Sequence, residues 1–196
     1  TVEVLPSSLS FLSLGDTETL SATVKDSGGN VLPDSVVTWA SYNTSIATVS
    51  SEGLVTAVAT GSATITATSG STSGSASVTV TQVASSVTLS PTSLSLASIG
   101  ATATLTPTVT DAAGTVISGA TVTWTTSSSS VATVSSAGLV TAVADGTATI
   151  TATSGSASAT ATTTVTQVAS SVTLSPTSLS FASLADTATL TPTVTD

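Results

Sequence analysis

The sequence predicts an all-β chain of tandem antiparallel β-sandwiches, on three observations. Landmark residues recur every 85 positions without insertion or deletion, as Pro6 and Pro91 or Trp39 and Trp124 show. Apolar residues alternate with serine and threonine within each repeat, and glycine-containing turn signals separate the alternating segments. A fixed period of this size marks an array of small domains, so the fold to be explained is that of one repeat.

The repeat divides the chain into two complete domains and a remnant, at residues 1–84, 85–169 and 170–196. The remnant holds only the first two strands of a third domain, and two strands do not form a stable core alone. We therefore expect a portion of a longer array. The alternative is that the remnant pairs with a neighbouring chain by strand addition.

The strands of one repeat are predicted by period-two alternation, which is typical of a half-buried strand. The first repeat opens with two such segments, at 2–14 and 17–25. The second repeat shows the alternation at 101–110, 121–125, 147–153 and 158–166, with turn signals between the segments. About seven strands per repeat predict a two-sheet antiparallel sandwich of the immunoglobulin type.

Each complete repeat contains one tryptophan, Trp39 or Trp124, on its third main strand. An immunoglobulin-like sandwich places its core tryptophan on that strand. We expect both indoles to be enclosed in the core, together with Ile65 and Ile150. Stacking of a ligand on the indole is the alternative.

Composition excludes several classes of partner. The net charge is −9, and Lys25 is the only basic residue against ten acids. Binding of nucleic acid is not expected, because neutralising phosphates needs Lys and Arg. Membrane insertion is not expected either, since hydroxyl side chains interrupt every apolar run before it reaches the ~18 residues of a spanning helix. The chain has no cysteine, and therefore no disulfide framework.

A 23-residue motif occurs twice in register, at 45–67, which opens Ser-Ile-Ala-Thr-Val-Ser-Ser-Glu-Gly-Leu, and at 130–152. This motif resembles the signature of bacterial immunoglobulin-like group 2 domains. The resemblance implies tandem domains of bacterial cell-surface and phage tail proteins, such as intimin- and invasin-like adhesins. There such domains commonly act as stalk modules, and the family has no general active site to carry over.

Catalysis is not expected, and we predict no catalytic, cofactor-binding or metal-ligating residue. Histidine, cysteine and arginine are absent, so acid–base work near neutral pH lacks its usual side chain. The serines have no candidate activating base except Lys25, which the second repeat lacks. No cofactor is implied.

Two sets of acidic residues are candidate calcium ligands. Asp16 and Glu18 could place two carboxylates at one strand start, but Ala101 and Ala103 replace them in the second repeat. We expect them to be solvated surface acids. A second set recurs at Asp26, Asp111 and Asp196, and Asx-turn hydrogen bonding explains an Asp that opens a glycine-containing hairpin.

Three further surface features suggest ligands or modifications. The threonines at 102, 104, 106, 108 and 110 could form a flat array that matches ice or a crystalline polysaccharide, although β-propensity explains them more simply. Tyr42 is the one candidate for binding a carbohydrate or receptor. Asn43–Ser45 formally fits a glycosylation acceptor, and O-glycosylation of exposed threonines is at least as plausible.

The boundary between repeats lacks glycine and proline from Ser75 to Ser90, so we expect a short, stiff junction and an elongated rod. The predicted function is a stalk or fibre of an extracellular bacterial surface protein that spaces and presents another domain. Its expected partners are neighbouring repeats of the same array. The alternatives are a self-assembling filament of several copies, and a phage tail or adhesin module that binds a host receptor or carbohydrate.

Overall fold

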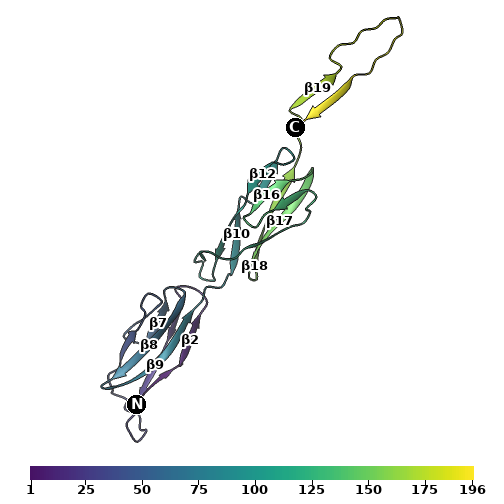
Figure 1. Ribbon diagram of the computed structural model, residues 1–196. Coiled ribbons are helices and arrows are strands. Elements are labelled where there is room, and N and C mark those ends of the chain that lie inside the picture. Colours follow the sequence, from purple (N-terminus) through teal and green to yellow (C-terminus); the bar gives the residue numbers. More distant parts are fainter. The chain divides into compact units, whose positions relative to one another are not determined.

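The computed structural model describes the whole chain, Thr1–Asp196, and its elements are strands (Figure 1). It contains no helix of the length and hydrophobicity needed to cross a bilayer. The residues group into two compact units. The first unit comprises Thr1–Thr88, Thr108–Thr121 and Ser154–Ala157, and the second comprises Leu89–Pro107, Val122–Thr153 and Ser158–Asp196.

One layer of the first repeat is a four-stranded sheet in the order β2-β9-β8-β5. Its strands are β2 (Ser8–Phe11), β9 (Thr72–Val80), β8 (Gly61–Ser69) and β5 (Thr38–Ser41). The nine-residue strands β8 and β9 form an antiparallel hairpin, and β5 runs antiparallel to β8. Strand β2 runs parallel to β9, with Leu9 opposite Val78.

The facing layer is built from β1 (Val2–Leu5) paired with β4 (Ser21–Val24), and from β3 (Thr17–Thr19), β7 (Leu54–Ala57) and β6 (Ala47–Val49) in the order β3-β7-β6. Leu20 lies between β3 and β4, and its N–H donates to the Gly53 carbonyl at 2.9 Å. Strands β3 and β4 therefore act as one strand that joins both parts of this layer. The chain changes layer between β1 and β2, where the Leu5–Pro6 bond is cis.

The core lies between these layers, and the alternation of the sequence fills it. Val55, Ile65 and Val78 are fully buried, while the threonines that alternate with Ile65 on β8 are exposed or half-buried. Burial of such side chains contributes roughly 1.5–3 kcal/mol each. The predicted burial of Ile65 is confirmed, as is that of Ile150.

The prediction that both tryptophans are enclosed is wrong in degree, because Trp39 and Trp124 are only half-buried. Each lies on an edge strand, β5 or β14 (Thr123–Thr126), which has a single neighbour in its sheet. The Trp39 indole packs against the rim of the core and covers Gly53. An edge strand has no neighbouring strand on its outer side, and the indole is correspondingly only partly covered.

The second repeat has the same architecture. Its sheets have the orders β10-β13, β11-β18-β17-β14 and β12-β16-β15. The remaining strands are β10 (Ser86–Ser90), β11 (Ser93–Leu96), β12 (Thr102–Thr104), β13 (Thr106–Thr110), β15 (Ala132–Val134), β16 (Leu139–Ala142), β17 (Gly146–Ser154) and β18 (Ala157–Val165). Strand β11 again runs parallel to β18.

The third segment is a hairpin of β19 (Ser171–Ser175) and β20 (Thr191–Thr195), in antiparallel register. Val172 and Leu174 are 63% and 48% exposed, whereas their counterparts Val87 and Leu89 are each 7% exposed. The prediction of an immunoglobulin-like sandwich is confirmed for the fold. Each complete repeat has nine strands, β1–β9 or β10–β18, instead of about seven, because some predicted strands are divided into shorter ones. Each also contains a parallel strand pair, because alternation carries no information on strand direction.

Replacing Ile65 by Ala should lower the free energy of unfolding of the first repeat by about 2–5 kcal/mol, since a fully buried side chain is removed from a closed core. The neighbouring exposed Thr64→Ala should change it by no more than about 0.5 kcal/mol. Denaturant unfolding measures both. Equal losses for the two variants would contradict the core described above.

Gly53→Ala should destabilise more than Gly29→Ala, although both glycines have a positive φ, +84° and +85°. An alanine in that conformation costs roughly 1–2 kcal/mol at either site. At Gly53 the new Cβ would also meet the Leu20 carbonyl and lie 3.1 Å from the Trp39 ring, whereas at Gly29 it meets nothing within 4 Å. The difference between the two unfolding midpoints isolates the clash.

Candidate functional site

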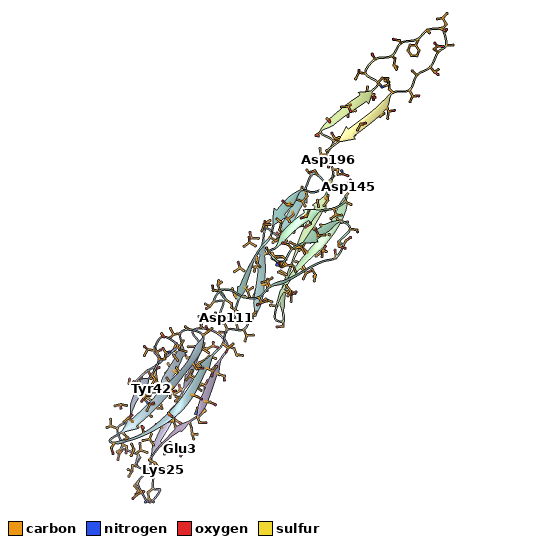
Figure 2. The ribbon with its side chains drawn as sticks, in the orientation of Figure 1. Glu3, Lys25, Tyr42, Asp111, Asp145 and Asp196 are labelled. Atoms are coloured by element: carbon orange, nitrogen blue, oxygen red, sulfur yellow. The ribbon has the colours of Figure 1, made fainter.

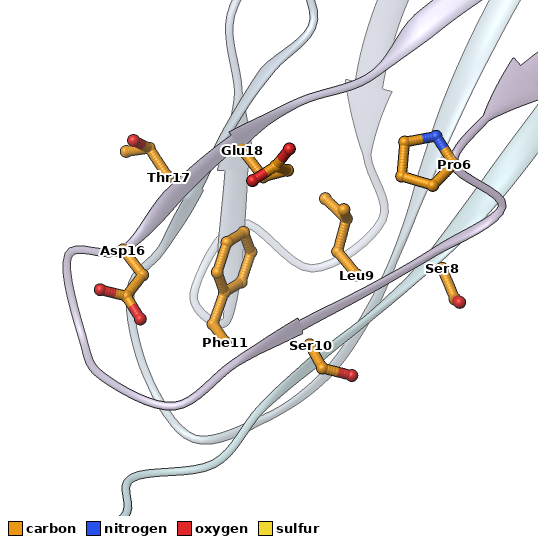
Figure 3. Close-up of a pocket in the computed structure, with 8 residues that line it drawn as sticks. All are labelled: Pro6, Ser8, Leu9, Ser10, Phe11, Asp16, Thr17 and Glu18. Carbon is orange, nitrogen blue, oxygen red and sulfur yellow. The ribbon is translucent and has the colours of Figure 1, made fainter.

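A groove of about 440 Å³ lies in the first repeat (Figure 3). Leu9 and Phe11 lie along it, with Pro6 towards one end and Asp16 at the other (Figure 3). Asp16 accepts a hydrogen bond from the Ser13 N–H at 3.1 Å, so its carboxylate closes its own loop. Glu18 also lines the groove, but no group of three or more acidic, histidine or cysteine side chains is placed to hold a metal ion.

The single lysine forms an ion pair with Glu3, at 2.7 Å between Lys25 Nζ and Glu3 Oε2 (Figure 2 labels both). Hydrogen bonding to the ammonium, and then its charge, hold the pKa of Glu3 below its ordinary value. Both side chains are partly exposed, so the pair is a surface feature of little energetic weight. Lys25, the one candidate base of the sequence, therefore acts as a hydrogen-bond donor to Glu3.

Tyr42 follows β5 and is 81% exposed, while its backbone N–H donates to the Thr64 carbonyl at 3.0 Å. The next residue, Asn43, accepts a hydrogen bond from the Ser45 hydroxyl through Oδ1 at 2.6 Å. The structure thus places the predicted aromatic on the surface, next to the predicted acceptor asparagine.

The predicted threonine array is divided between two strands. Thr102 and Thr104 belong to β12, which pairs with β16, whereas Thr106, Thr108 and Thr110 belong to β13, which pairs with β10. Leu105, between the two strands, is fully buried. The five threonines are therefore not one uninterrupted strand face.

Asp26 forms the Asx turn that the sequence predicts. Its Oδ1 accepts hydrogen bonds from the backbone N–H groups of Gly28 and Asn30, both at 2.8 Å. Its Oδ2 accepts from the Asn30 side chain at 3.0 Å. The Asn30 side chain and then its backbone N–H hold the pKa of Asp26 below its ordinary value.

Asp111, the equivalent residue of the second repeat, uses its two oxygens differently. Oδ1 closes the same turn by accepting from the N–H groups of Ala113 at 3.1 Å and Thr115 at 2.8 Å. Oδ2 accepts from the Gln82 side chain at 3.0 Å and from the Leu14 N–H at 3.1 Å. Asp111 is only 2% exposed.

Neutral donors surround this carboxylate. The Gln82 amide, followed by the backbone N–H groups of Thr115, Leu14 and Ala113, holds the pKa of Asp111 below its ordinary value, while desolvation opposes them. The Asx-turn prediction is confirmed for Oδ1. The role of Oδ2 could not be read from the sequence, because it joins a loop, a linker and a turn that are distant in the chain.

The linker beside Asp111 is tied through its own backbone. Thr81 N–H donates to the Phe11 carbonyl at 2.9 Å, Val83 N–H to the Leu12 carbonyl at 3.0 Å, and Ser85 N–H to the Thr110 carbonyl at 2.8 Å. We call residues Leu14, 81–85, Thr110 and Asp111 the first junction. All of them belong to the first compact unit.

The same arrangement recurs in the second unit, 85 positions further on. Asp196 Oδ2 accepts from the Gln167 side chain at 3.1 Å and from the Ile99 N–H at 3.3 Å. The linker N–H groups of Thr166, Val168 and Ser170 donate to the carbonyls of Leu96, Ala97 and Thr195 at 3.0, 3.1 and 2.8 Å. We call residues Ile99, 166–170, Thr195 and Asp196 the second junction. One signal in the sequence could have found both: the chain has two glutamines, and each lies in a linker.

Comparison with known proteins identifies the family of the chain. The model of the bacterial Ig-like domain (group 2) matches residues 1–80 and 83–165. A search of curated proteins gives no significant match.

Several solved structures resemble the chain. One is the surface layer protein SbsC, domains 1–6, with 28% identity and a TM-score of 0.43 over 81% of this chain and 24% of that one. Another is SbsC domains 4 and 5, with 29% identity and a TM-score of 0.41 over 76% of this chain and 81% of that one. Invasin, a bacterial integrin-binding protein, is 20% identical with a TM-score of 0.47, over 89% of this chain and 42% of that one. The chain thus spans about a quarter of the longer SbsC structure. Because the family model matches far more than half of the sequence, the chain belongs to the bacterial Ig-like domain family, group 2.

Proposed function

We propose that the chain is a non-catalytic structural segment of an extracellular bacterial surface protein, a stiff stalk or fibre that spaces and presents another functional domain. The observation that carries the proposal is the pair of junctions. In each, the linker backbone is hydrogen-bonded on both sides, to the strand end of one repeat and to β13 or β20 of the next. A linker held in this way lacks the freedom of a glycine- and serine-rich coil.

The composition of the exposed faces supports this role. Threonines and serines occupy the outward positions of the long strands β8 and β17, for example Thr64 and Thr149. Such faces present few charges and, with Lys25 as the single basic residue, few sites for trypsin-like proteases. We propose the domain boundaries 1–84, 85–169 and 170–196, and a rod in which one repeat extends on the order of 35–40 Å.

Chemistry is not part of the proposed role. The only basic side chain is occupied by Glu3, and the carboxylates of Asp16, Asp26 and Asp111 are engaged in closing loops and turns. We propose no catalytic, cofactor-binding or metal-ligating residue. Its partners would be the neighbouring repeats of the array.

A filament of several copies is the second candidate, in which a neighbouring chain would pair with the hairpin β19–β20 by strand addition. Direct binding of a receptor or carbohydrate, as in an adhesin or phage tail module, has exposed Tyr42 as its support.

Negative-stain microscopy and sedimentation of the purified chain test the proposal. We expect discrete short rods of one chain each, whereas long regular fibres would favour the filament. Val172→Asp is the matched variant: it should leave discrete rods unchanged, but it should break fibres that depend on the hairpin, because a buried unpaired charge is costly. Discrete particles without a preferred length would contradict the stalk.

A further inference from the structure

Asp26 and Asp111 differ in a way that their shared turn does not explain. Both close the turn through Oδ1, yet Asp26 Oδ2 is satisfied by Asn30 within the same turn. Thr115 replaces Asn30 in the second repeat, and its side chain carries no amide. Asp111 Oδ2 accepts from outside its turn instead, from the Gln82 side chain and the Leu14 N–H.

Asp196, the equivalent aspartate of the third repeat, makes the same pair of contacts. Asp196 lies in the second compact unit and accepts the equivalent two donors, Gln167 Nε2 and the Ile99 N–H. The loop donor is a backbone group, so Leu14 and Ile99 can differ in side chain without loss of the contact. Two occurrences with the same donors and acceptor indicate a built feature of the repeat.

We infer that this carboxylate is the clasp that fixes one repeat to the next. Asp111 Oδ2 joins the Leu14 loop of the first repeat and the Gln82 linker to the turn of the second repeat. Asp196, directly after β20, accepts the equivalent loop and linker donors one repeat later. The inference rests on the proposed stalk function and gives the residue that supplies its stiffness. It assigns Gln82 and Gln167 as the linker halves of the clasp. Charge-assisted hydrogen bonds of this kind are roughly twice as strong as neutral ones.

The clasp also has a pH dependence whose sign follows from the shifted pKa. The groups that bond the Asp111 carboxylate are all neutral amides, and the titratable group nearest to Leu14 in the loop is Asp16, which accepts from Ser13. Since the pKa of Asp111 is lowered from 3.8, its contribution is fully present above that value and is lost as the pH falls through the lower folded pKa. Neutral and mildly acidic conditions should leave the junction intact.

The chain has no cysteine, so spin labels can be placed at will, and the pair Thr64→Cys and Thr149→Cys puts one label on an exposed position of each complete repeat. The distance distribution between the labels, measured by pulsed electron resonance, reports the freedom at the first junction. We expect a narrow distribution in the otherwise unchanged chain. Asp111→Ala should widen it by about twofold or more, because the linker recovers part of its coil freedom.

Two further variants separate the clasp from the turn. Gln82→Ala removes one clasp donor and leaves the turn of Asp111 intact, so it should also widen the distribution. Asp26→Ala removes an equivalent turn that has no clasp, so it should leave the width unchanged. Circular dichroism of each variant monitors the sandwiches.

The outcomes distinguish the two proposals. A wide distribution in the unchanged chain would overturn the stiff stalk itself. A narrow distribution that stays narrow in both Asp111→Ala and Gln82→Ala would overturn the clasp and leave the stalk standing. Equal widening by Asp26→Ala would show that turn closure, and not the clasp, controls the junction.

Discussion

Burial of one face of every strand between two sheets is the constraint on which this molecule depends. The chain has no disulfide, and the structure contains one ion pair, on the surface, so each complete repeat is held by its own core. That core is made of small and branched side chains such as Val55, Ile65 and Val78. Because a side-chain period of two sets the face of every residue, the same alternation that fills the core places hydroxyl groups outside.

Because the fold depends on this alternation, the features that alternation defines could be predicted from the sequence, and the others could not. The period of 85, the alternation and the glycine turns define the sandwich, and the fully buried Ile65 and Ile150 follow from their place in the alternation. The parallel pairing of β2 with β9 could not be predicted, since alternation is the same whichever way a strand runs. The half-buried state of Trp39 depends on β5 being an edge strand, which is a property of sheet order.

The junction shows a different limit of sequence reasoning. The turn of Asp111 is local, and its Oδ1 bonds follow from an Asp placed before a glycine-containing hairpin. The Oδ2 bonds reach Leu14, 97 positions away, and no local rule predicts a contact with a backbone N–H at that distance. The sequence alone shows that Gln82 and Gln167 both lie in linkers. Their role as donors becomes clear only from the structure, which places the carboxylates of Asp111 and Asp196 beside them.

The chemistry of the clasp suits a chain that is almost without cations. An ion pair at each junction would need a basic residue per repeat, and Lys25 is the only one. Amide donors provide charge-assisted hydrogen bonds to Asp111 without a second charge. Salt screens the attraction between two separated charges, and it acts less on a buried carboxylate that is hydrogen-bonded to neutral donors. A junction built in this way keeps its hydrogen bonds across a wide range of ionic strength, whereas the exposed pair of Lys25 and Glu3 weakens as salt is added.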